Sequence, residues 1–160
     1  MKRPLRVALS FTAVLFCACL LRAQQVTVVN DDGTKTVLDQ SAIAGLPHVR
    51  VTTGGASPVS FEGVALKSVL EKAGVGFGDL LKGKRLASCL LVSGADGFQV
   101  VIVLPELDPS FTDKQVVLAF LQEGKPLSAS DGPFRIMIPD EKRMSRWVKQ
   151  VTTLKIVDAH

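Results

Sequence analysis

LASCLLVSGADGFQVVIVL, residues 86–104, carries the strongest strand signal in this 160-residue chain. Two apolar runs, 86–92 and 98–104, flank the turn-forming segment 93–97, which reads SGADG. Apolar runs of this length, bounded by glycine and aspartate, are typical of strands joined in a hairpin. We expect a central hairpin that is buried on both faces and supplies the core strands.

Weaker strand signals lie on both sides of this hairpin. Residues 25–29 and 34–38 flank Asn30-Asp31-Asp32-Gly33, whose Asp-Gly step favours a hairpin turn. Four further segments have strand patterns, namely 48–52, 116–121, 134–138 and 151–157. This distribution predicts an α+β fold of mixed, mostly β sheets with a few short helices.

Two short helices are expected between these strands. Asp39 can cap a helix that runs through Ile43. Residues 64–73 have helical spacing, with apolar side chains on one side and charged ones on the other. Glycines at 74, 76 and 78 follow this helix rather than a strand, so we interpret them as turn residues and not as a phosphate-binding loop.

Residues 1–23 have the layout of a secretory signal peptide. A basic start precedes an uncharged, mostly apolar run at 7–21, and Ala23 suits a cleavage site. A membrane anchor would need about 20 apolar residues, and this run stops at Arg22. We therefore predict that residues 24–160 form a single domain in the periplasm or outside the cell; lipid modification at Cys19 is the alternative to simple cleavage.

Removing residues 1–23 changes the charge balance. That segment contains four of the 19 Lys and Arg residues and none of the 15 Asp and Glu residues, so the formal net charge of +4 falls to about zero. A neutral domain argues against nucleic acid or a membrane surface as a partner. Only Cys89 remains of three cysteines, so no internal disulfide can form.

Few residues have the pattern of a catalytic or metal site. The chain has no Gly-x-Ser-x-Gly motif, and its only histidines are His48 and His160. Cys89 lies in an apolar run, where a thiol is usually buried and inert. Two acid pairs lie beside prolines in turn-like segments, where carboxylates usually face water: Glu106/Asp108 and Asp140/Glu141. We predict no catalytic residue and no metal ligand.

A basic cluster in residues 135–149 is the exception. Its five cations are Arg135, Lys142, Arg143, Arg146 and Lys149. Arg135 alternates with Phe134 and Ile136 and therefore leaves the face that those two residues bury. Guanidinium groups could hold a phosphate or carboxylate here through forked contacts. The alternative is an ordinary charged rim whose cations pair with Asp140 and Glu141.

Several short motifs recur here in the order found in one known family. They are FEGVAL at 61–66, AGV at 73–75, DGF at 96–98, GKPL at 124–127, GPFR at 132–135 and WVK at 147–149. Through them the chain, from about Val26 to Val157, resembles the oxidoreductase molybdopterin-binding domain of sulfite oxidase-like enzymes. The resemblance implies an α+β fold that holds a pyranopterin, with Arg135, Arg146 and Lys149 at cofactor-contacting positions.

The chain departs from this family where the metal would be bound. Active members have a metal-ligating cysteine before the FEGVAL-like segment, whereas residues 51–56 here read VTTGGA. A soft metal bound through sulfur needs a thiolate, which threonine and glycine cannot replace. The start Lys2-Arg3-Pro4 also lacks the twin arginine that exports proteins already folded around a cofactor.

Two main hypotheses follow. The favoured one is an exported, non-catalytic binding or accessory module with no bound cofactor, whose pterin pocket is degenerate or reused for a small anion or a protein partner. The alternative is a molybdopterin-dependent oxidoreductase subunit with a non-cysteine metal ligand. A plain structural protein would have a paired, solvated basic cluster without a cleft, whereas a pocket uniting Thr53, Arg135 and Lys149 would indicate a retained binding site.

Overall fold

The computed structural model describes residues 24–54 and 56–158, which form two five-stranded sheets. The strands are β1 Gln25–Val29, β2 Lys35–Asp39, β3 His48–Thr52, β4 Ser60–Ala65, β5 Cys89–Gly94, β6 Gln99–Val103, β7 Val117–Gln122, β8 Lys125–Pro126, β9 Arg135–Met137 and β10 Val151–Val157. The helices are α1 Gln40–Ala44 and α2 Leu66–Lys72, with short 3-10 helices η1 Gly78–Leu80, η2 Gly83–Ala87, η3 Leu104–Leu107 and η4 Met144–Arg146.

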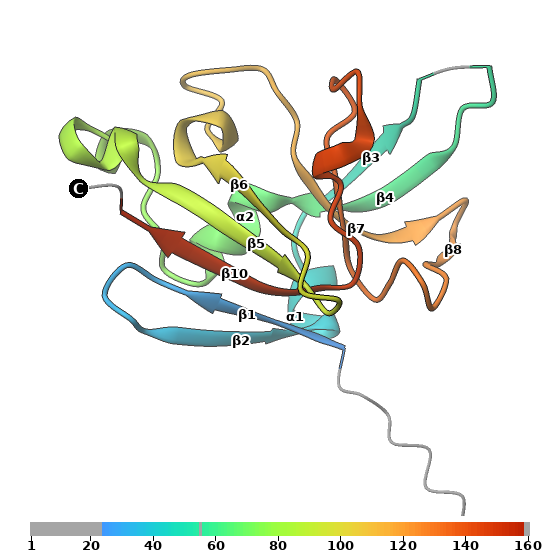
Figure 1. Cartoon of the computed structure of the whole chain (residues 1–160), viewed down its shortest axis with the longest axis horizontal. Helices are drawn as coiled ribbons and strands as arrows, with labels where there is room; N and C mark the ends of the chain where they lie inside the picture. Colours follow the sequence, from blue (N-terminus) through green and yellow to red (C-terminus); the bar gives the residue numbers. More distant parts are fainter. Residues whose placement is uncertain (1–23, 55, 159–160) are drawn as a thin grey trace, which may run out of the picture.

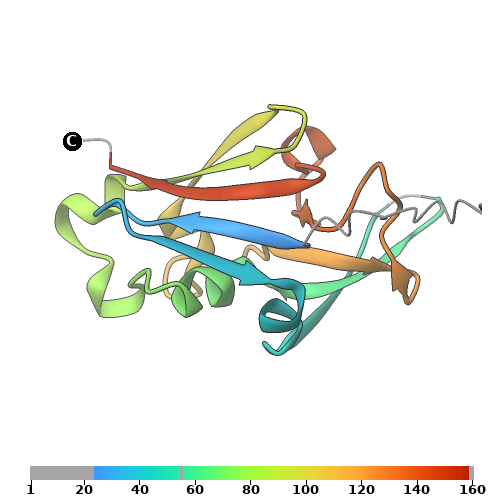
Figure 2. The same ribbon diagram turned by 90° about the horizontal axis from the view of Figure 1, so that it is seen from below.

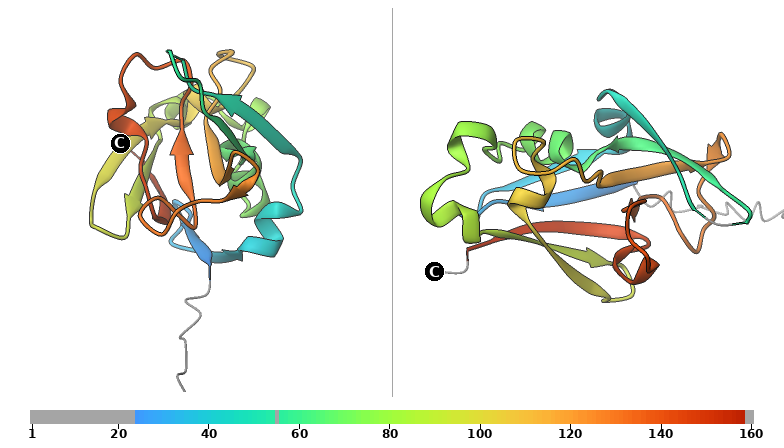
Figure 3. Two further views of the ribbon diagram at one scale, coloured as in Figure 1. Left: turned by 90° about the vertical axis from the view of Figure 1, so that its right-hand side faces the viewer. Right: turned by 90° about the horizontal axis from the view of Figure 1, so that it is seen from above.

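The first sheet has the strand order β2-β1-β10-β5-β6. Within it, β1 and β10 are parallel, and every other pair of neighbouring strands is antiparallel. Figure 2 shows β10 lying beside β1. The second sheet has the order β3-β4-β7, and both β8 and β9 pair with β7. The second sheet extends beyond one end of the first (Figures 1 and 3). The predicted α+β class with mostly β structure is confirmed.

The opening hairpin and the first helix form as predicted. β1 and β2 pair in register around the turn at Asn30 and Gly33. Asp39 caps α1, because its carboxylate accepts a hydrogen bond from the Ala42 amide at 2.7 Å. The hairpin and its capped helix thus bring the chain to the start of β3 at His48.

The β5–β6 hairpin forms as predicted, but the prediction that both of its faces are buried was wrong. Leu90 and Ile102 are 0% exposed and face the core, whereas Val101 is 50% and Val103 40% exposed. An antiparallel sheet can leave one face in solvent, and β6 is an edge strand of the first sheet. Because the exposed face of β6 also carries apolar side chains, its sequence resembles that of a strand buried on both faces.

The second helix starts later than expected, because residues 64 and 65 belong to β4, a strand that the sequence analysis missed. Gly63 explains why β4 was not recognised from the sequence. The register shifts between Glu62 and Gly63, and a Cβ on Gly63 would lie 2.2 Å from the Leu118 carbonyl oxygen. This close backbone approach interrupts the alternation by which a strand is recognised.

Both faces of the second sheet are covered near its centre. One row of directly paired residues, Val64, Leu118 and Ile136, is fully buried in the core.

The predicted signal peptide at 1–23 lies outside the described residues. Among the residues that are described, no helix has the length and apolar character needed to cross a membrane.

Candidate functional site

Arg135 lies at the end of a row that crosses the second sheet. Val49 pairs with Gly63, Gly63 with Ala119, and Ala119 with Arg135. Directly opposed residues of antiparallel strands point to the same side of a sheet. Arg135 therefore lies on the face opposite the Val64 row, as its alternation in the sequence predicted.

That face nevertheless encloses the Arg135 side chain, which is only 12% exposed. Its guanidinium carbon lies 5.7 Å from the centre of the Phe61 ring and 5.8 Å from that of Trp147. Such distances are typical of cation–π contacts. Trp147 is itself held in place because its indole N–H donates to the Ile138 carbonyl at 3.2 Å.

Asp131 forms ion pairs with two of the predicted cofactor-contacting cations. Arg135 Nη1 donates to Asp131 Oδ2 at 2.9 Å. Lys149 Nζ lies 2.7 Å from Asp131 Oδ1, as an ion pair without hydrogen-bond geometry. The carboxylate is 13% exposed, against 51% for the lysine side chain. Asp131 therefore bridges a buried and a solvated cation, while Arg135 Nε stays buried without a hydrogen-bond partner in the described part of the chain.

Arg146 is the third predicted cation, and it binds acidic side chains elsewhere. Its Nε donates to Glu141 Oε1 at 2.7 Å, and Nη2 also contacts Glu141. Nη2 lies 3.4 Å from Glu106 Oε2, and Nη1 donates to the Val101 carbonyl on the edge of β6 at 3.4 Å. The hydrogen bond to Glu141 raises the pKa of Arg146 above its ordinary value. Arg146 thus ties the η4 segment to the first sheet rather than joining Arg135.

The pairing expected for a charged rim is therefore only partly present. Glu141 binds Arg146 as expected, but Asp140 forms no ion pair within residues 24–54 and 56–158. Asp131 and Glu106 supply the other pairs, and the sequence analysis missed both roles. The signal for Asp131 was its position four residues before Arg135, next to the GPFR motif.

Thr53 stands in the stretch where the resemblance implies a metal-ligating cysteine. Its backbone N–H donates to the Val59 carbonyl at 2.9 Å, and its hydroxyl oxygen accepts from the Val59 N–H at 2.9 Å. Val51, two residues earlier, is paired with Phe61. Thr53 directly follows β3, which ends at Thr52. Its hydroxyl oxygen is engaged in closing the β3–β4 connection.

None of the four clefts identified in the described residues unites Thr53, Arg135 and Lys149. A cleft of about 460 Å³ lies on the same face of the second sheet, lined by Val49, Val117 and the segment 107–116. A larger one of about 610 Å³ lies beside Pro133 and Gln150 and is lined by uncharged residues. Arg135, Arg146 and Lys149 are thus all paired with acidic side chains, and none of the three lines any of these four clefts.

Cys89 lies on β5, far along the chain from the Thr53 position. It is half-buried rather than fully buried, and its Sγ lies 3.6 Å from the Val157 carbonyl oxygen. That carbonyl belongs to β10, the neighbouring strand of the first sheet. Within the described residues, no group of three or more His, Cys, Asp and Glu side chains could hold a metal ion.

His48 makes two hydrogen bonds that require a proton on each ring nitrogen. Nδ1 lies 2.8 Å from Glu62 Oε1 and Nε2 lies 2.9 Å from the Ala44 carbonyl oxygen, and both of these oxygens can only accept. The Ala44 and Glu62 bonds raise the pKa of His48 above its ordinary value of 6.5. The ring also packs edge-on against Phe120, with centroids 5.4 Å apart. These contacts give His48 a structural role between α1 and β4.

Asp108 corrects the expectation that both acid pairs face water. It is 2% exposed and accepts hydrogen bonds from the Gly78 N–H at 2.7 Å and the Ser110 N–H at 3.0 Å. The Ser110 bond, with the Gly78 bond, lowers the pKa of Asp108 below its ordinary value. The side chain fixes the segment after η3 against the turn that follows α2.

Comparison with known proteins identifies the family. The oxidoreductase molybdopterin binding domain family matches residues 10–160. This chain belongs to that family. Among solved structures, it is similar to the sulfane dehydrogenase SoxCD from Paracoccus pantotrophus, with 21% identity and a TM-score of 0.64 over 84% of this chain. It spans only 38% of that chain, so the likeness establishes the fold. No curated protein matches the chain.

Two parts of the family's cofactor can be tested against the residues of this member. The metal needs a soft donor, and Thr53 offers a hydroxyl oxygen that already accepts from Val59. The anionic phosphate needs unpaired cations, and Arg135 and Lys149 share Asp131. The donor set therefore does not fit the metal, and Asp131 competes with a phosphate for both cations.

Proposed function

We propose that this family member is an exported, non-catalytic binding or accessory module without a metal centre. The observation that carries the proposal is Asp131, which lies between the two cations at cofactor-contacting positions, Arg135 and Lys149. A carboxylate in this place supplies from within the chain the negative charge that a ligand phosphate would bring. The position retains its two cations, and one of their two charges is already balanced from within the chain.

Thr53 supports the same conclusion at the metal end. Its hydroxyl can neither supply a thiolate nor leave the Val59 N–H without losing the bond that closes the β3–β4 connection. The Thr53 hydroxyl and the Asp131 carboxylate concern different chemical parts of one cofactor. A chain with both would keep the fold without the original reaction.

If the protein is non-catalytic, its role is to bind a ligand or a partner protein outside the cytoplasm. The layout of residues 1–23 supports export, and the balanced charge of the rest of the chain argues against nucleic acid and membrane lipids as partners. A small anion could displace Asp131 from Lys149, because that lysine is half in solvent. The exposed valines of β6 offer a surface for a protein partner.

Metal and pterin analysis of the full-length gene product, purified from its native compartment, tests this function. We expect less than a tenth of an equivalent of molybdenum by mass spectrometry and no pterin fluorescence after acid oxidation. A family member with the metal-ligating cysteine, purified in parallel, controls for loss of cofactor during preparation. Stoichiometric molybdenum in this protein would overturn the proposal.

Family membership favours one alternative, a molybdopterin-dependent oxidoreductase subunit with a non-cysteine ligand. This alternative predicts a charge-transfer absorption band in the visible range for the native protein. It also predicts that Arg135→Ala and Lys149→Ala each lower the cofactor content while the protein stays folded. Native protein that is colourless and free of metal would eliminate it.

A further inference from the structure

The outer face of the first sheet lies open to solvent. Figures 1 and 3 show β10 and β5 at the surface, with α2 on the opposite side of the sheet. Directly paired residues of neighbouring strands point to the same side of a sheet. On the outer face they form one row that crosses all five strands, in the order Lys35, Val29, Lys155, Leu91 and Val101.

The β6 end of this face is apolar. A second row of paired residues lies beside the first and consists of Val157, Cys89 and Val103. Together with Leu91 and Val101 these residues make one patch on three neighbouring strands, which we call the apolar patch. Its two valines on β6 are 50% and 40% exposed, and its other members are half-buried. Contiguous exposed apolar side chains of this kind mark interaction sites.

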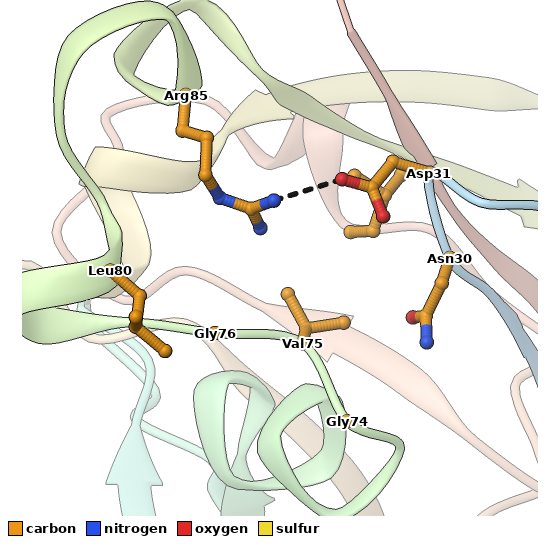
Figure 4. Close-up of a pocket in the computed structure, with 8 residues that line it drawn as sticks. Asn30, Asp31, Gly74, Val75, Gly76, Leu80 and Arg85 are labelled. Carbon is orange, nitrogen blue, oxygen red and sulfur yellow. Dashed lines mark hydrogen bonds and ion pairs between the residues drawn. The ribbon is translucent and has the colours of Figure 1, made fainter.

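Two lysines border the apolar patch without an acidic partner. Lys35 and Lys155 are exposed, and neither makes an ion pair in the described part of the chain. The acids nearest to them in sequence are engaged elsewhere. Asp31 accepts a hydrogen bond from Arg85 at 2.8 Å (Figure 4), and Asp158 accepts one from a buried serine hydroxyl. The two cations stand two strands apart, about 10 Å, and are available to carboxylates from outside the chain.

The free edge of β6 is less suited to a partner than the face. The Leu104 N–H donates to the Ser88 carbonyl at 3.0 Å, and hydrogen-bonded pairs alternate along an antiparallel ladder. Val101 therefore directs its N–H and C=O toward the free edge. Arg146 already donates to that carbonyl at 3.4 Å and is held there by Glu141. A partner strand added to this edge would have to displace Arg146.

A second copy of the chain is also a poor occupant of this face. In a two-fold dimer the same residues of both copies meet. The five strands of the sheet contain one acid, Asp39, and its carboxylate is engaged by the Ala42 N–H at the start of α1. Two copies packed face to face would bring lysines together without free carboxylates to pair with them.

We propose that the outer face of the first sheet binds an acidic amphipathic helix of a partner protein. Apolar side chains at helical spacing pack on the apolar patch, and carboxylates along one border of that stripe reach Lys155 and Lys35. The proposal rests on the binding role proposed above and names the class of partner and its surface. The metal and pterin analysis tests that role by a separate measurement, so failure of the helix to bind would leave that result standing.

A labelled 18-residue peptide tests the proposal, with leucines at helical spacing and glutamates along one border of the leucine face. It is titrated with the full-length gene product, purified after export, and followed by fluorescence anisotropy and circular dichroism. We expect saturable binding, a gain of helix in the peptide, and amide shifts in the ¹⁵N-labelled protein at residues 89–91, 101–103 and 155–157. Lys35→Gln combined with Lys155→Gln should weaken binding about fivefold, the effect of losing two exposed ion pairs.

Lys84→Gln combined with Lys125→Gln is the matched control, because these lysines are also exposed, make no ion pair in the described residues and lie outside the first sheet. It should leave the affinity unchanged, and a peptide with lysines in place of the glutamates should not bind. Equal affinity for a scrambled peptide, equal affinity in the Lys35 and Lys155 double variant, or no binding would overturn the proposal. Binding to phosphatidylglycerol vesicles instead of the peptide would assign the face to a membrane, and dimers closed by this face would assign it to a second copy.

Discussion

Replacing Asp131 with asparagine should destabilise the protein and at the same time create a binding site for anions. Removing one partner of a fully buried ion pair costs about 3–5 kcal/mol. Arg135 and Asp131 are 12% and 13% exposed, and asparagine keeps an acceptor for Nη1. The contact with the half-exposed Lys149 adds at most about 1 kcal/mol. We therefore expect a loss of about 2 kcal/mol, or about 6–8 °C in Tm.

Inorganic phosphate should restore much of this loss. At about ten times its Kd, a ligand that binds only the folded state stabilises it by about 1.4 kcal/mol. In the parent protein Asp131 occupies the same cations, so phosphate should raise Tm far less. Calorimetry with and without phosphate, at constant ionic strength, measures both effects. Asp140→Asn is the control, since Asp140 makes no ion pair in the described chain, and equal phosphate responses in all three proteins would refute the reasoning.

Three other substitutions test the fold and its charges. Because protonation of His48 stabilises the folded state, this contribution should be full below about pH 6.5 and lost as pH rises through its raised pKa; His48→Gln should abolish that slope in Tm. Gly63→Ala should cost at least about 3 kcal/mol in denaturant unfolding, because its Cβ would meet the Leu118 carbonyl, whereas Gly54→Ala should stay within about 0.5 kcal/mol. Asp108→Asn should cost about 2 kcal/mol, since one buried N–H loses its acceptor, and an unchanged midpoint would contradict this role.

The strands with plain periodicity could be predicted closely from sequence. β3 and β10 have the expected bounds, and the cap on α1 follows from Asp39 alone. β4 could not, because the approach of Gly63 to β7 is a tertiary contact that breaks the local pattern. Its apolar end was therefore assigned to the helix that follows. Burial of the β6 outer face was overestimated for a related reason: valine favours a strand in either environment, so its presence does not reveal which face is covered.

The candidate site was predictable as a set of cations but not as a set of pairs. Arg135, Arg146 and Lys149 stand within one short segment, and family motifs surround them. Charge pairing depends on how loops fold back, and it separates these residues: Arg146 turns to Glu141 and the edge of β6, while the other two share Asp131. Composition can indicate that a cluster is basic, whereas only the fold determines which acid neutralises each cation.

The effects of Thr53 and Asp131 reinforce one another because they differ in kind. Loss of the thiolate removes a ligand, and by itself it would leave a basic pocket able to hold the pterin phosphate. The Asp131 carboxylate adds a competitor, and by itself it would only weaken that hold. In the function proposed above, they together oppose the cofactor at both its metal and its anionic parts. A variant freed of Asp131 should therefore gain affinity for phosphate without gaining a metal centre, which separates the anion site from the catalytic one.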